Sequence, residues 1–182
     1  SLLAGLALRD LQDELDADIH VIGTPSEESL DGGKNEMAAH GGFDHIDVAF
    51  MVHGSTLTQL ETPSLALIEM DVEFHGKTAH AGIAPYAGRS AVDAVTMLQT
   101  GLGLMRNHLK DSSRVSNIVL AGGTAVNSVP DFAKVKVEIR HSSMAYLESV
   151  EQWTREIAQA AAMATQTQVQ ITSVAHIYNT TI

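Results

Sequence analysis

The segment "LIEMDVEFH" at residues 67 to 75 constrains the fold of this 182-residue chain more than any other stretch. Its apolar side chains alternate strictly with polar ones, so that Glu69, Asp71 and Glu73 share one face of an extended backbone. Successive side chains of a β-strand point in opposite directions, and strict alternation is therefore typical of a strand with one buried face. The segment is predicted to be such a half-buried strand.

The residues that follow change their hydrophobic period in a definite order. Apolar side chains three or four residues apart predict helices, whereas alternating or short apolar runs predict strands. The expected elements are a helix at 88–109, strands at 115–121 and 133–140, a helix at about 144–165 and a strand at 168–175. The order β-α-β-β-α-β is the split arrangement of a ferredoxin-like sandwich, an α+β fold.

In that topology the first and third strands are central, antiparallel neighbours. The solvent face of the third strand carries a mainly basic row, Lys134, Lys136 and Arg140, opposite the acidic row of the first strand. Opposite charges on paired strands stabilise a sheet by about a few tenths of a kcal/mol per pair. The charges and the hydrophobic period therefore predict the same topology.

Residues 1 to 62 follow a different pattern. They predict a helix within 1–18, a strand at 18–23, a short helix at 35–43 and a strand at 47–54. This α/β fragment is too small to bury a core by itself. We therefore expect it to belong to a larger domain or to pack on the sandwich.

Composition excludes several classes of protein and site. The chain has no cysteine, so any metal must be held by His, Asp or Glu. A formal net charge of −11 argues against a general nucleic-acid binder. No apolar run approaches the roughly 20 residues that span a bilayer, so we expect no membrane partner and take the cytoplasm as the default location.

Glu27 and Glu28 lie in the loop "GTPSEESLDGGK", directly after the first expected strand of the N-terminal fragment. Carboxylates at the C-terminal end of a strand in an α/β layer lie where active sites usually form. One could bind a metal while its neighbour acts as a general base toward a water molecule. A solvated loop is the alternative explanation of the pair.

His53 ends the next expected strand, in "FMVHGS". An imidazole and a carboxylate at neighbouring strand ends would suit zinc, manganese or cobalt. A histidine at the boundary of an apolar strand can also be an ordinary surface residue. The combination of His53 with the glutamate pair favours a metal site more than either does alone.

Two loops and one strand end of the sandwich carry further candidates. His80 lies between Gly76 and Gly82, which imply a tight backbone, and it could donate to an oxyanion or be a simple turn histidine. Asn127 lies in a connection of about ten residues, long for a hairpin, which favours a functional loop. Arg140 ends the third strand, where it could pair with the acidic row or bind a substrate carboxylate bidentately.

Taken together, these stretches resemble a known family. "GTPSEE", "GGK", "GGFDHIDVAFMVHG", "FHGKTAHAGIAPYAGRSAVDAV", "GGTAVNSVPD" and "VEIRH" occur in the order seen in the dinuclear-zinc amidohydrolases and metallopeptidases related to aminoacylase, carboxypeptidase G and aminobenzoyl-glutamate hydrolase. The Gly-Thr-Pro before the glutamates and the Gly-Gly-Lys after them look most like the aminobenzoyl-glutamate hydrolase and dipeptidase branch. The resemblance is to the central segment of such enzymes, because their His-x-Asp metal motif precedes this segment and their last His ligand follows it.

The resemblance implies the metal chemistry. Glu27 would be the general base, Glu28 a metal ligand and His53 a ligand of the second ion. Two divalent ions are expected, zinc first, with manganese or cobalt as alternatives. The ligand set within this segment would be incomplete, so the segment by itself is expected to be inactive and could lack metal.

The resemblance also implies how a substrate would be held. His80, contributed by the partner subunit of a homodimer, and Asn127 would bind the oxyanion and the substrate backbone. Arg140 would bind the substrate carboxylate. The substrate would be a small amide or dipeptide.

The implied organisation and function follow. Residues 1–62 would be part of an α/β catalytic domain of the zinc-peptidase type, 63–176 a βαββαβ lid and dimerisation domain, and 177–182 the start of the return to the catalytic domain. The expected reaction is hydrolysis of the amide bond of an N-acyl amino acid, an aminobenzoyl-glutamate-like conjugate or a dipeptide through a metal-activated water. The alternative is a non-catalytic dimerisation module.

Overall fold

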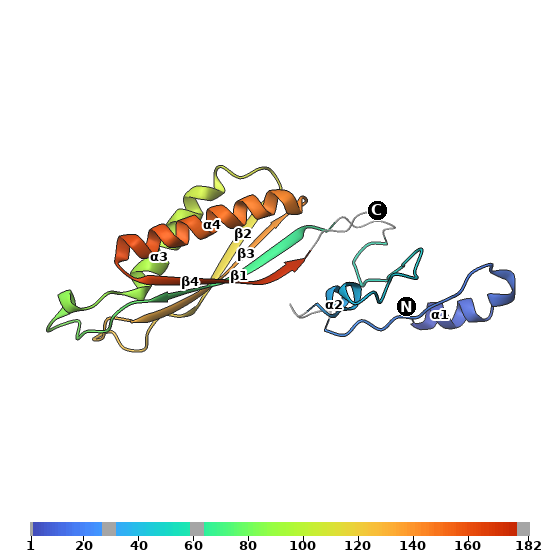
Figure 1. Cartoon of the computed structure of the whole chain (residues 1–182), viewed down its shortest axis with the longest axis horizontal. Helices are drawn as coiled ribbons and strands as arrows, with labels where there is room; N and C mark the ends of the chain where they lie inside the picture. Colours follow the sequence, from blue (N-terminus) through green and yellow to red (C-terminus); the bar gives the residue numbers. More distant parts are fainter. Residues whose placement is uncertain (1, 27–31, 59–63, 178–182) are drawn as a thin grey trace. The chain divides into compact units, whose positions relative to one another are not determined.

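The computed structural model describes residues 2–26, 32–58 and 64–177 of the chain. These residues form two compact units that divide between residues 61 and 62, and each unit is described by itself. The second unit contains the sheet and its two long helices (Figure 1).

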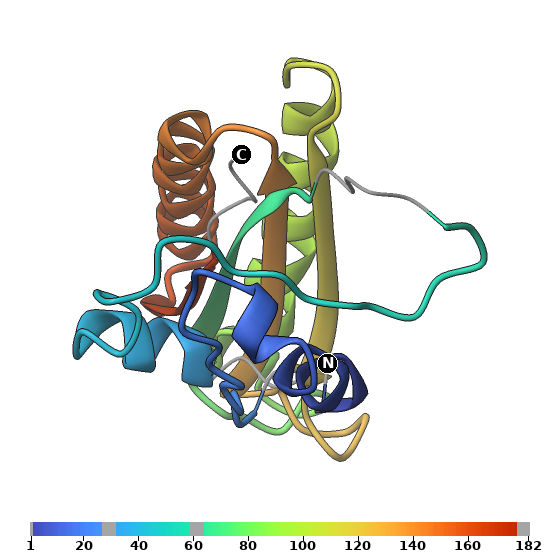
Figure 2. The same ribbon diagram turned by 90° about the vertical axis from the view of Figure 1, so that its right-hand side faces the viewer.

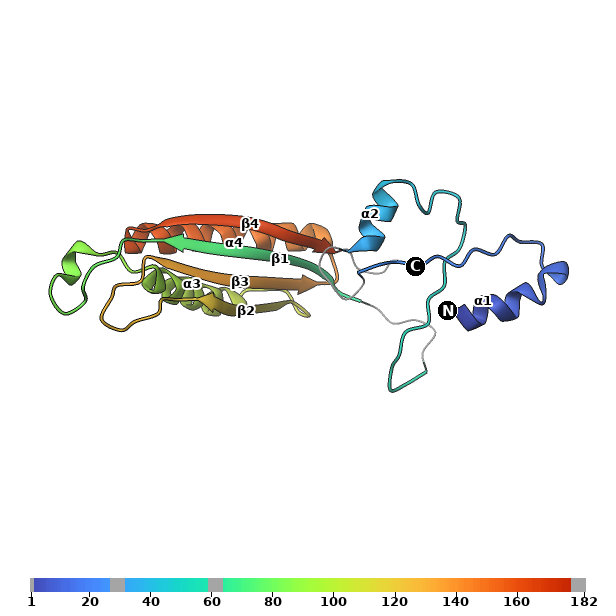
Figure 3. The same cartoon turned by 90° about the horizontal axis from the view of Figure 1, so that it is seen from below.

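The second unit is a four-stranded antiparallel sheet covered on one face by two helices. Its elements are β1 (Ala66–His75), the 3₁₀ turn η2 (Pro85–Ala87), α3 (Ala91–Arg106), β2 (Arg114–Ala121), β3 (Phe132–His141), α4 (Met144–Thr165) and β4 (Gln168–Ile177). The strand order is β2-β3-β1-β4, and Figure 3 shows it from the open face of the sheet. The predicted βαββαβ topology is confirmed, with β1 and β3 as the central neighbours.

The core lies between the sheet and the helices. The helices contact each other, and both contact β1 and β3 (Figure 2). Every second residue of the two central strands is fully buried, as alternation requires. The largest of these strand side chains and their partners on the helices are Ile68, Met70, Val72, Phe74, Val135, Val137, Ile139, Leu98, Leu102, Met105 and Leu147.

The long helices begin at serine caps. The Ser90 hydroxyl accepts a hydrogen bond from the Asp93 N–H (3.2 Å), and the Ser143 hydroxyl accepts one from the Tyr146 N–H (3.3 Å). The first of these helices is therefore shorter than the predicted 88–109, because the backbone before Ser90 is committed to loop contacts. Within the described ranges, none of the helices combines the length and the apolar character that crossing a membrane requires.

The open face of the sheet carries the predicted rows of opposite charge. Lys134 Nζ lies 2.7 Å from Asp71 Oδ2 and 2.9 Å from Glu73 Oε1, while Lys136 pairs with Glu69 and lies 3.4 Å from Asp71 Oδ1. Burial alone would raise the pKa of Asp71, but the hydrogen bond with Lys134 and the charge of Lys136 outweigh burial and lower that pKa. The two lysines thus each join two neighbouring carboxylates.

The two edges of the sheet differ in character. On β2 three consecutive apolar residues, Ile118, Val119 and Leu120, are exposed by 59%, 43% and 51%; we call them the apolar edge. The exposed positions of β4 near its start are instead Gln168 and Gln170. Polar edge strands resist pairing with another chain, whereas an apolar edge favours it.

The first unit is mainly irregular. It contains α1 (Leu2–Arg9), the 3₁₀ turn η1 (Gln12–Glu14) and α2 (Gly33–Ala39). The strands predicted at 18–23 and 47–54 are wrong for this structure, since neither segment is a strand. A strand needs a neighbour to share its backbone hydrogen bonds, and within the described part of this unit there is none. No side chain described there is buried, and Phe50 is exposed by 91%.

The ion pairs of the open face predict how stability responds to acid. Because the folded state lowers the pKa of Asp71 below its ordinary 3.8, this carboxylate stabilises the fold above about pH 4, and the contribution disappears as pH falls through the lowered value. Asp71→Asn should therefore reduce the free energy of unfolding by about 1 kcal/mol at pH 7. The difference from the unmodified chain should shrink near pH 3, as measured by urea unfolding. Asp111→Asn, a substitution in an exposed loop, serves as the control and should change stability less at pH 7.

Candidate functional site

Two loops meet at one end of the sheet, which we call the tip: the loop after β1 and the loop before β3. The Val129 N–H donates to the Ala79 carbonyl oxygen, and the Ala81 N–H donates to the Asn127 carbonyl oxygen, both at 2.9 Å. These bonds continue the antiparallel pairing of β1 and β3 beyond the sheet. The opposite end, where β1 and β2 begin and β3 and β4 end, we call the base.

Gly76 fixes the path of the chain into the tip. A Cβ atom at this position would lie 2.1 Å from the carbonyl oxygen of Arg89, so a side chain cannot be accommodated without moving the backbone. The backbones of Lys77 and Arg89 exchange two hydrogen bonds of 2.8 Å directly beside it. The tight backbone predicted from the glycines is present at Gly76, whereas a Cβ atom at Gly82 would make only ordinary contacts of 3.6 and 3.7 Å with the His80 ring.

His80 is exposed at the tip, and its tautomer follows from its contacts. The Gly82 N–H donates to His80 Nδ1 at 3.2 Å, so Nδ1 is an acceptor and the proton of the neutral ring is on Nε2. The Nε2–H is then the donor of the ring, and the hydrogen bonds of the described residues leave it unused. His80 and Ser128 form an isolated antiparallel β-bridge. The structure therefore brings His80 and Asn127 together on the two adjoining loops of the tip.

Arg140 lies far from this pair within one copy of the chain. In the register of β1 and β3, Arg140 is opposite Leu67, whereas the tip begins beyond the pair of His75 and Phe132. The eight residue-to-residue steps from Leu67 to His75 span about 26 Å at about 3.3 Å per step. The structure therefore does not unite Arg140 with His80 and Asn127 in a single copy.

The guanidinium of Arg140 is held by Glu138 on the same strand. Arg140 Nε donates to Glu138 Oε1 at 2.7 Å and Nη2 donates to Oε2 at 3.0 Å, a bidentate pair that raises the pKa of Arg140. Of the alternatives left open by the sequence, pairing with the acidic row of β1 is not observed. Sequence reasoning missed Glu138, although residues two apart on a strand share a face.

His53 is exposed in the first unit. Its Nδ1 lies 2.7 Å from the Gly54 carbonyl oxygen, which can only accept, so Nδ1 carries the proton. The lone pair of Nε2 is then available to a cation, as in metal-binding histidines that donate their other nitrogen to a carbonyl. Donor chemistry at His53 thus fits a zinc-type ion. Glu27 and Glu28 lie outside the described residues, and among those described no three or more His, Asp or Glu side chains form a metal-binding group.

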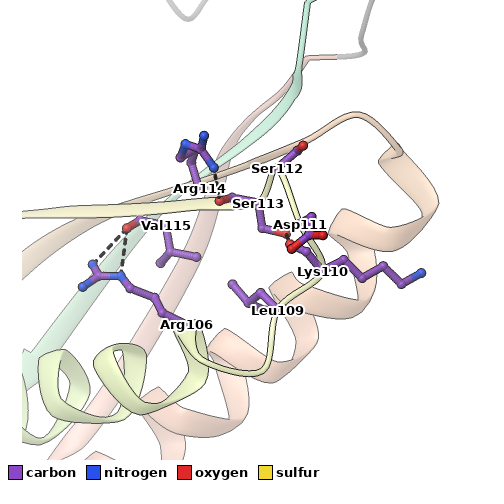
Figure 4. Close-up of a pocket in the computed structure, with 8 residues that line it drawn as sticks. All are labelled: Arg106, Leu109, Lys110, Asp111, Ser112, Ser113, Arg114 and Val115. Carbon is purple, nitrogen blue, oxygen red and sulfur yellow. Dashed lines mark hydrogen bonds between the residues drawn. The ribbon is translucent and has the colours of Figure 1, made fainter.

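A hollow of about 360 Å³ lies at the base, on the helix side of β2 (Figure 4). Two of its three cationic side chains already have partners: Arg106 donates through Nε and Nη2 to the Val115 carbonyl oxygen (3.1 and 2.9 Å), and Lys110 Nζ lies 4.4 Å from the centre of the Tyr146 ring. None of the candidate residues lines this hollow. It is lined by Arg106, Leu109, Lys110, Asp111, Ser112, Ser113, Arg114 and Val115.

The sandwich matches a known protein family. The model of a family described as the peptidase dimerisation domain matches residues 66–166, more than half of the chain. The chain belongs to this family. The match begins with β1 and ends just beyond α4, so the peptidase dimerisation domain coincides with most of the sandwich.

Relatives with known names extend the match into the first unit. The chain is 35% identical over 158 residues to the Xaa-Arg dipeptidase of Mus musculus (87% of this chain, 36% of the relative). It is 34% identical over 154 residues to one of the subunits of the p-aminobenzoyl-glutamate hydrolase of Escherichia coli (84% and 32%). The resemblance predicted from the motifs is confirmed, and the chain spans about a third of the length of these relatives.

Among solved structures, the aminobenzoyl-glutamate utilization protein of Klebsiella pneumoniae is similar, with a TM-score of 0.60 and 30% identity. The similarity covers 64% of this chain and 30% of that protein. The peptidase dimerisation domain is therefore recognised by sequence and by structure.

The protonation of His80 is a direct prediction from the tip geometry. At a pH where the ring is neutral, NMR correlations between the ring carbon-bound protons and the ring nitrogens should show His80 with the proton on Nε2. His53 should show the opposite tautomer, with the proton on Nδ1, and so provides an internal comparison. A His80 proton on Nδ1 would contradict the acceptor role that Gly82 requires.

Proposed function

We propose that this chain is the central segment of a metal-dependent amidohydrolase that cleaves N-acyl amino acids, aminobenzoyl-glutamate-like conjugates or dipeptides. In this proposal residues 1–62 belong to the catalytic domain, 63–176 form the lid and dimerisation domain, and 177–182 begin the return to the catalytic domain. The ordered motifs, the peptidase dimerisation domain and the names of the relatives support it.

The separation of Arg140 from the tip is the observation that carries the proposal furthest. A small amide cannot contact two groups about 26 Å apart, yet His80 and Asn127 are proposed to bind the scissile amide and Arg140 its carboxylate. If the tip of one copy lies beside the base of another copy, groups from both ends can contact the same substrate. The site would then be composite, with Arg140 from one subunit and His80 and Asn127 from its partner.

The apolar edge supports such a dimer. β2 runs from the base to the tip, with Arg114 at the base and Ala121 at the tip. If two copies pair β2 antiparallel to β2 about a two-fold axis, the tip of each lies alongside the base of the other. The adjoining surface of α3 exposes Met97 and Leu104 by 46% and 69%, which extends the apolar surface available to the pair.

Each side chain has a definite part in the proposed hydrolysis. Glu28 and His53 would hold part of a divalent metal site, and the ion, when bound, would supply Lewis-acid activation of water. Glu27 takes the proton of the attacking water as general base. The Nε2–H of His80 donates to the oxygen that becomes negative as the amide carbon turns tetrahedral. Because Nδ1 is already engaged by the loop backbone, that donor is oriented before substrate arrives.

Asn127 and Arg140 would position the substrate. The Asn127 backbone is fixed by its bond from Ala81, which leaves the exposed side-chain amide available to hydrogen-bond a substrate backbone. Arg140 uses Nε and Nη2 for Glu138, so the Nη1 edge of the guanidinium remains for a substrate carboxylate.

Separate variants test the two glutamates in the complete protein. Glu27→Ala should abolish turnover and leave metal content intact, because the general base does not hold the metal. Glu28→Ala should lower metal content as measured by elemental analysis. Unchanged metal content and activity in both variants would rule out the assignment.

Mixed dimers test the composite site. His80→Ala and Glu27→Ala subunits, each inactive alone, should regain part of the activity when co-expressed, because a mixed dimer contains one site with both residues intact. The same pair carrying Ile118→Asp, which places a charge on the apolar edge, should regain less. If no activity returns although mixed dimers are isolated, His80 and Glu27 act from the same subunit.

A non-catalytic dimerisation module is the second candidate function, favoured by the extent of the family match, which covers most of the sandwich. Metal content, amidase activity and molecular mass of the 182-residue chain itself distinguish the two. A stable dimer with no tightly bound metal and no activity would favour the module for this segment.

A further inference from the structure

Two arginines face each other at the base of the open face. In the register of β2 and β3, Arg114 is directly opposite Arg140. Residues directly opposite on paired strands point to the same face, with Cβ atoms about 4.5–5.5 Å apart. Like charges so placed are destabilising, and the chain as a whole carries a net charge of −11.

The two arginines differ in their partners. Arg140 is held bidentately by Glu138. Arg114 donates through Nη1 to the adjacent Ser113 carbonyl oxygen (2.8 Å), and within the described residues it forms no ion pair with a carboxylate. The pair thus holds two positive charges against one negative charge, and Arg114 is exposed.

Figure 4 shows that Arg114 lies on the opposite side of the β2 ribbon from Arg106, Leu109 and Val115. Arg114 is among the residues that line the hollow, but its position opposite Arg140 in the strand register places its side chain on the open face of the sheet. Its surface is the open face, which it shares with Arg140. Pairing of β2 with a second copy through its backbone edge would leave this face free, because side chains stand perpendicular to the sheet.

We propose that Arg114 is a specificity-determining residue that binds a second carboxylate of the substrate, the side-chain carboxylate of an aspartate or glutamate. This inference rests on the proposed function, in which Arg140 binds the α-carboxylate. The two carboxylates of such an amino acid are joined by a short methylene linker, which matches the close spacing of two directly opposed arginines. An arginine side chain on the substrate would instead be repelled by Arg114.

The names of two relatives point to different substrate side chains: one is called an Xaa-Arg dipeptidase and another a p-aminobenzoyl-glutamate hydrolase. The proposal distinguishes between these two classes for this chain. For this chain the positive charge of Arg114 favours the acidic class. The test compares N-acyl-glutamate with N-acyl-glutamine, which has the same shape but no side-chain charge, and with N-acyl-arginine.

In the complete protein, Arg114→Gln should lower kcat/KM for the glutamate substrate by about 10-fold to 100-fold, the range for losing a charge-assisted contact. It should leave kcat/KM for the glutamine substrate nearly unchanged. Arg114→Lys should retain part of the preference, and Arg114→Glu should shift it toward the arginine substrate. Lys110→Gln, which removes a charge from the helix side of the same turn, is the matched control and should leave the glutamate-to-glutamine ratio unchanged.

The outcomes separate this inference from the proposed function. Equal losses for both substrates in Arg114→Gln, or no preference for glutamate in the unmodified protein, would overturn the role of Arg114 while leaving the amidohydrolase intact. Absence of amidase activity on all three substrates would overturn the proposed function itself. Thermal unfolding of each variant shows whether a loss of activity is a loss of folding. If Arg114→Gln is unstable, the glutamate-to-glutamine ratio of Arg114→Lys tests the role of Arg114 instead.

Discussion

The pairing of β1 on both of its sides is the constraint on which the sandwich depends. β1 shares its backbone hydrogen bonds with β3 and β4, so that neither of its edges is open. Its apolar face is completely buried beneath α3 and α4 at Ile68, Met70, Val72 and Phe74. Each such side chain contributes about 1.5–3 kcal/mol through burial. The same strand presents Asp71 and its acidic neighbours to the lysines of β3, so one element organises the core and the charged face together.

A sheet held in this way is a rigid spacer between two chemically different ends. The tip presents His80 and Asn127 on loops whose backbones are fixed by hydrogen bonds. The base presents Arg114 and Arg140 on strand positions fixed by register. Because the paired length of β1 and β3 separates the ends, neither can approach the other without disrupting the sheet. Any function that uses both ends on one small molecule therefore needs a second copy.

The sequence predicted the sandwich well because its pattern and its burial arise from the same residues. Apolar residues alternate at 67–75 and recur every three or four residues in the helices. Both patterns arise from a core that forms within the second unit itself. The same reasoning failed at 18–23 and 47–54, where apolar runs such as the one around Phe50 lack a hydrogen-bonding neighbour. An apolar run shows that a segment would be buried in a complete domain, but a strand exists only where another strand is paired with it.

The candidate site was predicted unevenly for a similar reason. Local signals such as the glycines around His80 could be read from the sequence, since a tight backbone is a local property. The sequence could not show that Arg140 pairs bidentately with Glu138 and not with the acidic row of β1, because Glu138 and the acidic row lie on the same face of the sheet. Arg114 was missed altogether, since its position opposite Arg140 depends on register. Glu27 and Glu28 lie outside the described residues, so their roles stay predictions.

The unlike edges of the sheet have a further consequence for assembly. An antiparallel sheet with two apolar edges could add copies at both sides and grow into a filament, as open edges do in fibrous aggregates. Here the opposite edge begins with exposed Gln168 and Gln170 and presents less apolar surface to an incoming strand, with Val174 exposed by 42%. If two copies pair through Ile118, Val119 and Leu120, as proposed above, the more apolar edge of each copy is covered. Further growth would have to use the more polar edge at β4, so the asymmetry of the sheet would limit assembly beyond a pair of copies.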